Sequence, residues 1–243
     1  MSSFVLSNAQ VLVGSAELSA FTGEFTVGGE VAIEPAQHMA AGGYAVTLPG
    51  IVRASFDVKG NADFASGGVS QTFGYAQLGT QYAASVVPAG TAATYGDAAV
   101  LTRGYLSRLK GLLGATGKVA GFELGLTSDT AEVNGFVGAP LASRTTSGLT
   151  GTAVALTGPT ASQRLWAALH VTAASGTNLA VKVQSDDNGS FTSATDRITF
   201  STVSATGWQF SYVDGSFSSE THHRVTATVA TGTFSFVVLM GVM

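Results

Sequence analysis

Cysteine is absent from the 243-residue chain, so no disulfide, thiolate nucleophile or cysteine-based zinc site can form. Charged residues are also scarce, at 11% of the chain, whereas an average soluble domain has roughly 25%. Small residues take their place, including 31 glycines. Such a weakly charged surface is typical of a protein whose faces are covered by copies of itself. A secreted or weakly charged enzyme is the alternative.

Long apolar runs are lacking too. No segment approaches the ~20 residues that a membrane-spanning helix requires, and the best candidate, residues 234–242, has the length of a strand. The first ten residues lack the basic region that opens a signal peptide. We therefore expect a soluble protein made in the cytoplasm and not inserted in a membrane.

The chain has no basic segment of the kind that nucleic-acid-binding proteins carry. Residues 1–140 contain ten acidic and six basic residues, whereas residues 141–243 contain five of each. The net charge of −4 therefore resides in the first part.

The histidines do not form a metal-binding pattern. His222 and His223 are neighbours on a predicted strand, so their side chains face opposite sides and cannot chelate one ion together. His170 alternates with Trp166 and Ala168, which indicates a strand histidine that is hydrogen-bonded in the core or faces solvent.

Loop motifs of known chemistry are incomplete. The segment 186–189 is rich in oxygen ligands but lacks the spacing of a calcium loop, which favours a turn. The glycine-rich segment 111–119 lacks the first glycine and the final Ser/Thr of a phosphate-binding loop. No G-x-S-x-G elbow is present, and the carboxylates are not paired across a recognisable cleft. We predict no catalytic, cofactor or metal site.

The clearest structural pattern runs from Tyr44 to Asp63. Side chains from Val52 to Lys59 alternate between apolar and polar, which is the pattern of a half-buried strand. Pro49-Gly50 is a turn dipeptide, so the segment predicts a β-hairpin over residues 44–59.

The rest of residues 1–141 predicts further strands. They are a strand at Val11–Val13, one through Phe21–Val27 closed by a turn at Gly28-Gly29, a strand over 82–87, a strand with a bulge at Gly104 over 98–113, and a strand over 118–127. A short helix at 62–65 or 75–83 is also compatible with the sequence, and the leucine spacing within 98–113 fits a helix as the alternative to a strand.

Residues 142–151 are small and polar, which is typical of a linker. Beyond them, alternating apolar residues recur every 8–12 positions, the spacing of a β-sandwich. We therefore predict an all-β fold with little helix. Residues 1–141 would form a barrel-like or sandwich-like domain, and residues 152–243 a β-sandwich accessory domain.

The order of these features resembles the major tail-tube proteins of long-tailed, siphovirus-like bacteriophages. The resemblance covers residues 1–140 and includes LPGI (48–51), SFDVKGNAD (55–63), VVPAG (86–90), AVLTRGYLSRL (99–109) and GKVAGFELGL (117–126). The second part resembles domains that are appended to phage virion proteins.

This resemblance implies a structural virion protein that assembles into stacked hexameric rings, forming a tail tube for DNA passage. The hairpin 44–59 would contribute to a shared inner β-barrel, which removes exposed sheet edges. DNA would pass without specific binding, past lumen-facing acids that repel phosphates. The candidate acids are Glu24, Glu30, Glu34 and Asp57, and the candidate inter-ring contacts are Ser2, Ser3, Phe4, His38 and Met39.

The expected partners are copies of the chain itself and other tail proteins, and the expected location is the virion. Two alternatives stay open. One is another phage structural protein, such as a capsid decoration protein or a baseplate or tail-tip component. The other is a carbohydrate-binding module that uses Trp166, Trp208 and Tyr212, although alternation with apolar neighbours favours core packing of these rings.

Overall fold

The computed structural model describes residues 9–36, 46–62, 73–113, 119–130, 132–145 and 148–243. These residues form an all-β fold, as the sequence predicted, and within them the helical elements are short 3₁₀ turns at Tyr75–Gln77 (η1) and Gly90–Ala92 (η2). In the described ranges no helix has the length and apolar character needed to cross a membrane.

The chain divides into two compact units that interleave along the sequence. Unit 1 comprises residues 1–22, 82–102 and 133–243, and unit 2 comprises residues 23–81 and 103–132. The predicted linker, residues 142–151, contains the end of one strand and the whole of another. The two units are thus a different division of the chain from the predicted domains at 1–141 and 152–243, and that domain division stays a prediction.

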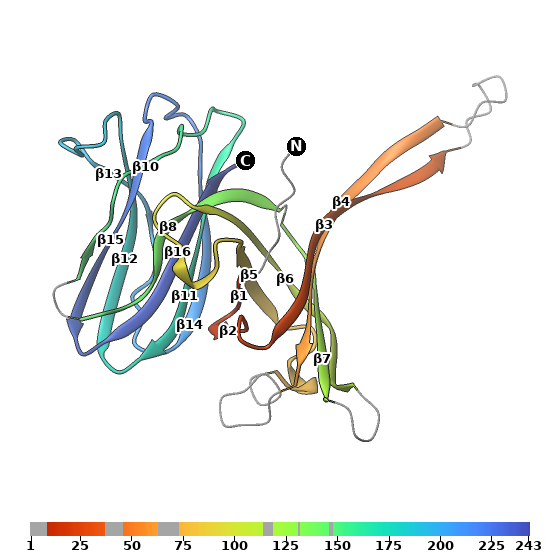
Figure 1. Cartoon of the computed structure of the whole chain (residues 1–243). Coiled ribbons are helices and arrows are strands. Elements are labelled where there is room, and N and C mark those ends of the chain that lie inside the picture. Colours follow the sequence, from red (N-terminus) through yellow and green to blue (C-terminus); the bar gives the residue numbers. More distant parts are fainter. Residues whose placement is uncertain (1–8, 37–45, 63–72, 114–118, 131, 146–147) are drawn as a thin grey trace. The chain divides into compact units, whose positions relative to one another are not determined.

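Unit 1 contains two antiparallel sheets (Figure 1). The first has the order β14-β11-β16-β8-β6-β5-β1-β2. Its strands are β1 (Gln10–Val13), β2 (Ala16–Glu17), β5 (Gln81–Val87), β6 (Ala98–Leu113), β8 (Val133–Arg144), β11 (Arg164–Ala174), β14 (Gly207–Asp214) and β16 (Phe234–Val242).

The second sheet has the order β10-β15-β12-β13, with β9 also paired to β15. Its strands are β9 (Leu149–Thr150), β10 (Val154–Ala155), β12 (Thr177–Asp186), β13 (Thr195–Thr199) and β15 (His222–Thr231). The alternation predicted for the second part of the chain is confirmed by these strands.

Apolar side chains cover both faces of the first sheet. On one face, Leu165 and Val238 pack against Val181 and Val225 of the second sheet, forming the core of a β-sandwich. A second cluster includes Leu12, Val87, Leu101, Ala168 and Leu239. Full burial of such a side chain contributes about 1.5–3 kcal/mol. These two clusters explain why strands β11 and β16 are apolar on both faces.

Unit 2 contains the remaining strands of the first sheet, which branch from β6 in the order β3-β4-β7-β6. Its strands are β3 (Thr22–Ala36), β4 (Val46–Asn61), β7 (Gly121–Ser128) and the later part of β6. The predicted alternation is confirmed where β4 pairs with β7, because Phe56 and Val58 are buried whereas Ser55 and Lys59 are exposed. Phe122, Leu124 and Leu126 of β7 are buried as well.

Two predicted turns are wrong. Pro49-Gly50 lies inside β4, and Gly28-Gly29 lies inside β3. The hairpin is instead formed by β3 and β4, which lie side by side in Figure 1. Proline is tolerated on a strand that lacks a neighbour on one side. The register of β4 with β7 covers Ser55–Asn61, which leaves Pro49 beyond that pairing.

Two other predictions concern local irregularities. Residues 98–113 form a strand as predicted, but the expected bulge at Gly104 is wrong, because the register of β6 with β7 shifts between Leu106 and Arg108 and between Lys110 and Leu113. Residues 81–87 form strand β5, and within the described residues 73–80 the helical element is η1, whereas the helix considered at 62–65 lies almost wholly outside the described residues.

Candidate interaction surface

The polar face of the unit 2 sheet carries a ladder of charged side chains across three strands. Arg108 of β6 forms ion pairs with Asp57 of β4 and, at 3.2 Å, with Glu123 of β7. Lys110 of β6 lies 2.8 Å from Glu123. Glu123 is therefore shared by two cations, and the hydrogen bond from Lys110 is the main cause that lowers the pKa of its carboxyl.

Gly125 makes the contact between Arg108 of β6 and Asp57 of β4 possible. In the register of the sheet it lies opposite Asp57 on one side and Arg108 on the other. A Cβ at Gly125 would lie 2.6 Å from the Asp57 Oδ1 atom and 3.3 Å from the Arg108 Nε atom. The ion pair therefore passes over the backbone of Gly125, where any side chain would obstruct it.

The predicted lumen-facing acids have different environments. Asp57 is paired with Arg108, and Glu24 lies 3.3 Å from the Lys59 Nζ atom. Glu30 and Glu34 belong to β3, but their side chains lie outside the described part of the structure. Among the described side chains of the ladder, the acids Glu24, Asp57 and Glu123 match the bases Lys59, Arg108 and Lys110 in number. Whether these acids face a lumen stays a prediction.

The residues predicted to form inter-ring contacts all lie outside the described residues. They are Ser2, Ser3, Phe4, His38 and Met39.

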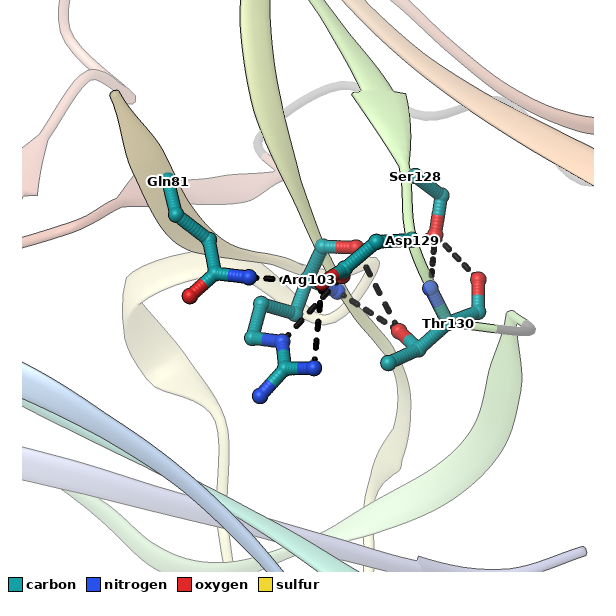
Figure 2. Close-up of polar contacts among 5 residues, drawn as sticks. All are labelled: Gln81, Arg103, Ser128, Asp129 and Thr130. Atoms are coloured by element: carbon teal, nitrogen blue, oxygen red, sulfur yellow. Dashed lines mark hydrogen bonds and ion pairs between the residues drawn. The ribbon is translucent and has the colours of Figure 1, made fainter. Parts of the chain in front are cut away.

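A second polar network in unit 2 was not predicted from the sequence (Figure 2). The Arg103 guanidinium donates two hydrogen bonds of 3.1 Å to the two carboxylate oxygens of Asp129, and the Gln81 amide donates one of 2.6 Å to the same carboxylate. The Arg103 backbone N–H donates to Thr130 Oγ1 at 3.1 Å, and Ser128 Oγ donates to the Arg103 carbonyl at 2.9 Å.

This network joins three positions where the chain passes from one unit to the other. Gln81, Arg103 and the segment 128–130 lie next to the crossings at residues 81–82, 102–103 and 132–133. They are far apart in the sequence, so only the strand register brings them together.

In unit 1, His170 is a fully buried histidine with both ring nitrogens in hydrogen bonds. Its Nδ1 atom lies 2.7 Å from the Gly14 carbonyl oxygen, and its Nε2 atom lies 2.9 Å from Ser85 Oγ. Because a carbonyl oxygen only accepts, Nδ1 carries the proton and Nε2 accepts from the Ser85 hydroxyl. Burial lowers the pKa of His170 to about 4, against the raising effect of the Gly14 hydrogen bond. The prediction of a hydrogen-bonded core histidine is confirmed.

His223 is buried, whereas His222 beside it is partly exposed, as expected for neighbours on a strand. The His223 Nδ1 atom lies 3.0 Å from the Leu156 carbonyl oxygen and must donate, while Nε2 is buried without a hydrogen-bond partner. Burial lowers the pKa of His223 to about 4. Both buried histidines are therefore neutral near pH 7.

The aromatic rings considered for carbohydrate binding lie on β11 and β14, where they contact other rings. Trp166 lies 4.7 Å from Tyr212 and 5.6 Å from Phe210, measured between ring centroids, and Trp208 lies 6.4 Å from Tyr82. Tyr212 is 48% exposed, but the Arg164 guanidinium lies over its ring at 4.5 Å. The rings are tilted against one another and form two groups, Trp166 with Phe210 and Tyr212, and Trp208 with Tyr82.

Within the described ranges, no three His, Cys, Asp or Glu side chains come together in a way that could hold a metal ion. Asp186 accepts a hydrogen bond from the backbone N–H of Ser193 at 2.9 Å and stabilises the turn that follows β12. A cavity of about 240 Å³ beside Leu169, Val203 and Trp208 is lined by apolar, hydroxyl and amide groups, without an ionisable side chain.

Comparison with solved structures finds ten similar chains, of which two are described here. No family model and no curated protein matches the sequence. A chain of the virion of a native gene transfer agent particle is 14% identical over 51% of this chain and 93% of that chain, with a TM-score of 0.35. The SPP1 Dit protein, described as a paradigm of the hub adsorption apparatus in phages that infect Gram-positive bacteria, is 9% identical over 97% of this chain and 99% of its own, with a TM-score of 0.37.

Proposed function

We propose that the chain is a structural subunit of a phage-like virion, made in the host cytoplasm, whose copies assemble into the stacked rings of a tail tube. The sequence resemblance of residues 1–140 suggests the tail-tube role. The pairing of the β3–β4 hairpin supports assembly of copies into rings.

The hairpin is the feature that carries the proposal. Among the described residues, β3 pairs with β4 alone, and the register of β4 with β7 is confined to Ser55–Asn61. The remainder of β4, residues 46–54, forms a two-stranded ribbon with β3 that extends beyond β7 (Figure 1). An isolated two-stranded ribbon is marginally stable in water, and its unpaired edges are templates for another strand.

A second copy of the chain supplies the missing neighbour. Pairing β3 of one copy with a strand of the next would satisfy its open N–H and C=O groups and close a ring of strands into a barrel. The ladder on β4, β7 and β6 is then the wall along which DNA passes without specific binding.

Hydrogen exchange measured at two concentrations tests the proposal. Light scattering and negative-stain microscopy of the full chain should show rings or tubes at high concentration, and the amides of β3 should exchange more slowly there than in dilute monomer. The amides of β12 and β15 serve as the internal control, because both strands are already paired within unit 1. Particles that form with unchanged β3 exchange would refute pairing through this edge.

The same samples separate tail-tube assembly from the other virion roles. A capsid decoration protein would stay monomeric or form small oligomers and bind to empty heads, and a tail-tip component would form single rings that do not stack. Either result would contradict the tail-tube role and redirect the search within virion proteins.

A further inference from the structure

Three basic side chains lie close together on the polar face of the unit 2 sheet, and each forms an ion pair with an acidic side chain. We propose that Asp57 and Glu123 mask a latent phosphate-binding site formed by Lys59, Arg108 and Lys110. The inference deepens the proposed function and rests on it. In the proposed tube, these two carboxylates would prevent DNA from binding to the inner surface.

The register places the cations around one central acid. Lys59 of β4 and Lys110 of β6 both lie opposite Glu123 of β7, and Arg108 lies 3.2 Å from the same carboxylate. The bulge between Leu106 and Arg108 places Arg108 opposite Gly125, where its guanidinium reaches Asp57 as well.

The two masking acids are less exposed than the bases. The Glu123 and Asp57 side chains are 12% and 27% exposed, whereas those of Arg108, Lys59 and Lys110 are 44%, 49% and 52% exposed. The cationic groups therefore reach the solvent, and Glu123 lies beneath them. A polyanion that approaches this face contacts the ammonium and guanidinium groups first. Whether it binds then depends on whether the less exposed acids neutralise these groups.

The net charge of these acids and bases determines whether the surface binds phosphate. With Glu24, Asp57 and Glu123 ionised, the three bases are matched and the described ladder has no net charge. Replacing Asp57 and Glu123 by their amides would leave a net charge of +2 within a few ångströms. Charges this close act well within the Debye length of about 10 Å at 0.1 M salt. Clustered Lys and Arg then bind phosphates and release counterions.

This mechanism differs from an acidic wall that repels DNA at long range. If repulsion by net negative charge excluded DNA, removing two acids would weaken the repulsion without creating a binding site. If the acids mask a cation cluster, the same change creates one. The first explanation predicts no binding site in this variant and the second predicts one, so measuring its binding to DNA distinguishes them.

The test uses the full chain with the double substitution D57N/E123Q and a fluorescently labelled 30-base-pair duplex. We expect the variant to bind the duplex at least tenfold more tightly than the unchanged chain in 50 mM salt. Its affinity should fall with salt with a logarithmic slope of about −2 to −3, the value for two or three phosphate contacts.

Two further variants test whether the gain in DNA binding comes from the three basic residues of unit 2. D196N/D214N produces the same change in net charge but frees Lys182 and Arg164, which lie on different strands of unit 1. It should bind no better than the unchanged chain. Adding R108Q/K110Q to D57N/E123Q should abolish the gained binding.

Circular dichroism and thermal unfolding confirm that each variant is folded. If the double variant does not fold, D57N and E123Q are tested separately, and each should show part of the gain. A folded variant without increased binding, or an equal increase in D196N/D214N, would overturn the inference. Assembly is measured separately by light scattering, so a chain that never forms rings but gains binding would contradict the proposed function alone.

Discussion

At the scale of single residues, the buried histidines show how a strand pattern produces a pH-sensitive interior. His170 links β11 to Ser85 of β5 and to the Gly14 carbonyl next to β1. Protonation would place a second N–H at Nε2, where the Ser85 hydroxyl would have to turn to accept. The folded state therefore favours the neutral ring.

The stability of the protein should fall when the pH is lowered from 6.5 toward 4. In this range the unfolded chain binds protons at His170 and His223, whose folded pKa values are about 4, and the folded chain does not. Proton binding by the unfolded state makes the free energy of unfolding rise with pH, by at most about 1.4 kcal/mol per pH unit for each histidine. Urea unfolding between pH 4.5 and 7 measures the slope, and H170Q should remove about half of it. An unchanged slope in H170Q would contradict the assignment.

Two glycines of the unit 2 sheet should respond differently to the same added methyl group. A Cβ at Gly104 would lie 2.4 Å from the backbone oxygen of Thr127, whereas one at Gly125 would meet the ends of the Asp57 and Arg108 side chains. Backbone cannot move without breaking the β6–β7 pairing, so G104A should cost about 1–3 kcal/mol, the range for overpacking. G125A should cost about 1 kcal/mol or less, because it displaces an exposed ion pair. Urea unfolding of both variants measures the two losses in free energy of unfolding, and equal losses would refute this distinction.

At the scale of elements, the sequence predicted strands wherever alternation was clear and failed where turn residues lie inside a strand. Pro49-Gly50 and Gly28-Gly29 satisfy the local chemistry of turns, but β4 and β3 continue through them. The local sequence contains no information about which strand lies alongside, and that pairing decides whether such a dipeptide bends the chain. The same reason explains Gly104, whose role is close contact with β7.

The Arg103–Asp129 pair should be coupled more strongly than an ordinary surface ion pair. Two parallel hydrogen bonds join the side chains, which are 31% and 24% exposed, and Gln81 holds the same carboxylate. A double-mutant cycle with R103Q and D129N should give a coupling free energy of about 1 kcal/mol. The Arg164–Asp214 pair, with one hydrogen bond of 2.7 Å and exposures of 47% and 75%, is the control and should give less. Equal coupling energies for the two pairs would show that the network adds nothing.

At the scale of the whole molecule, the all-β class was predictable because it depends on alternation alone. The candidate surface was predictable only in part: Asp57 and Glu24 were identified as acids of interest, but not their partners. Arg108 is 51 positions from Asp57, and their contact depends on the register of β7 between them and on the missing side chain of Gly125. A surface that the sequence suggested was acidic is therefore balanced over its described side chains.

The last prediction concerns assembly and separates ring formation from stacking. Ser2, Ser3 and Phe4 precede β1, whose first residue, Gln10, is buried and pairs with Val87 of β5. Deleting residues 2–8 therefore removes Ser2, Ser3 and Phe4 of the proposed inter-ring contacts, retains His38 and Met39, and leaves β1 and the β3–β4 hairpin in the chain. We expect the truncated chain to form single rings that no longer stack, because rings depend on strand pairing between hairpins. Negative-stain microscopy distinguishes rings from tubes, and the full-length chain at the same concentration is the control. Normal tubes from the truncated chain would remove these residues from the stacking contact, and loss of rings as well would show that the N-terminal segment acts within the ring.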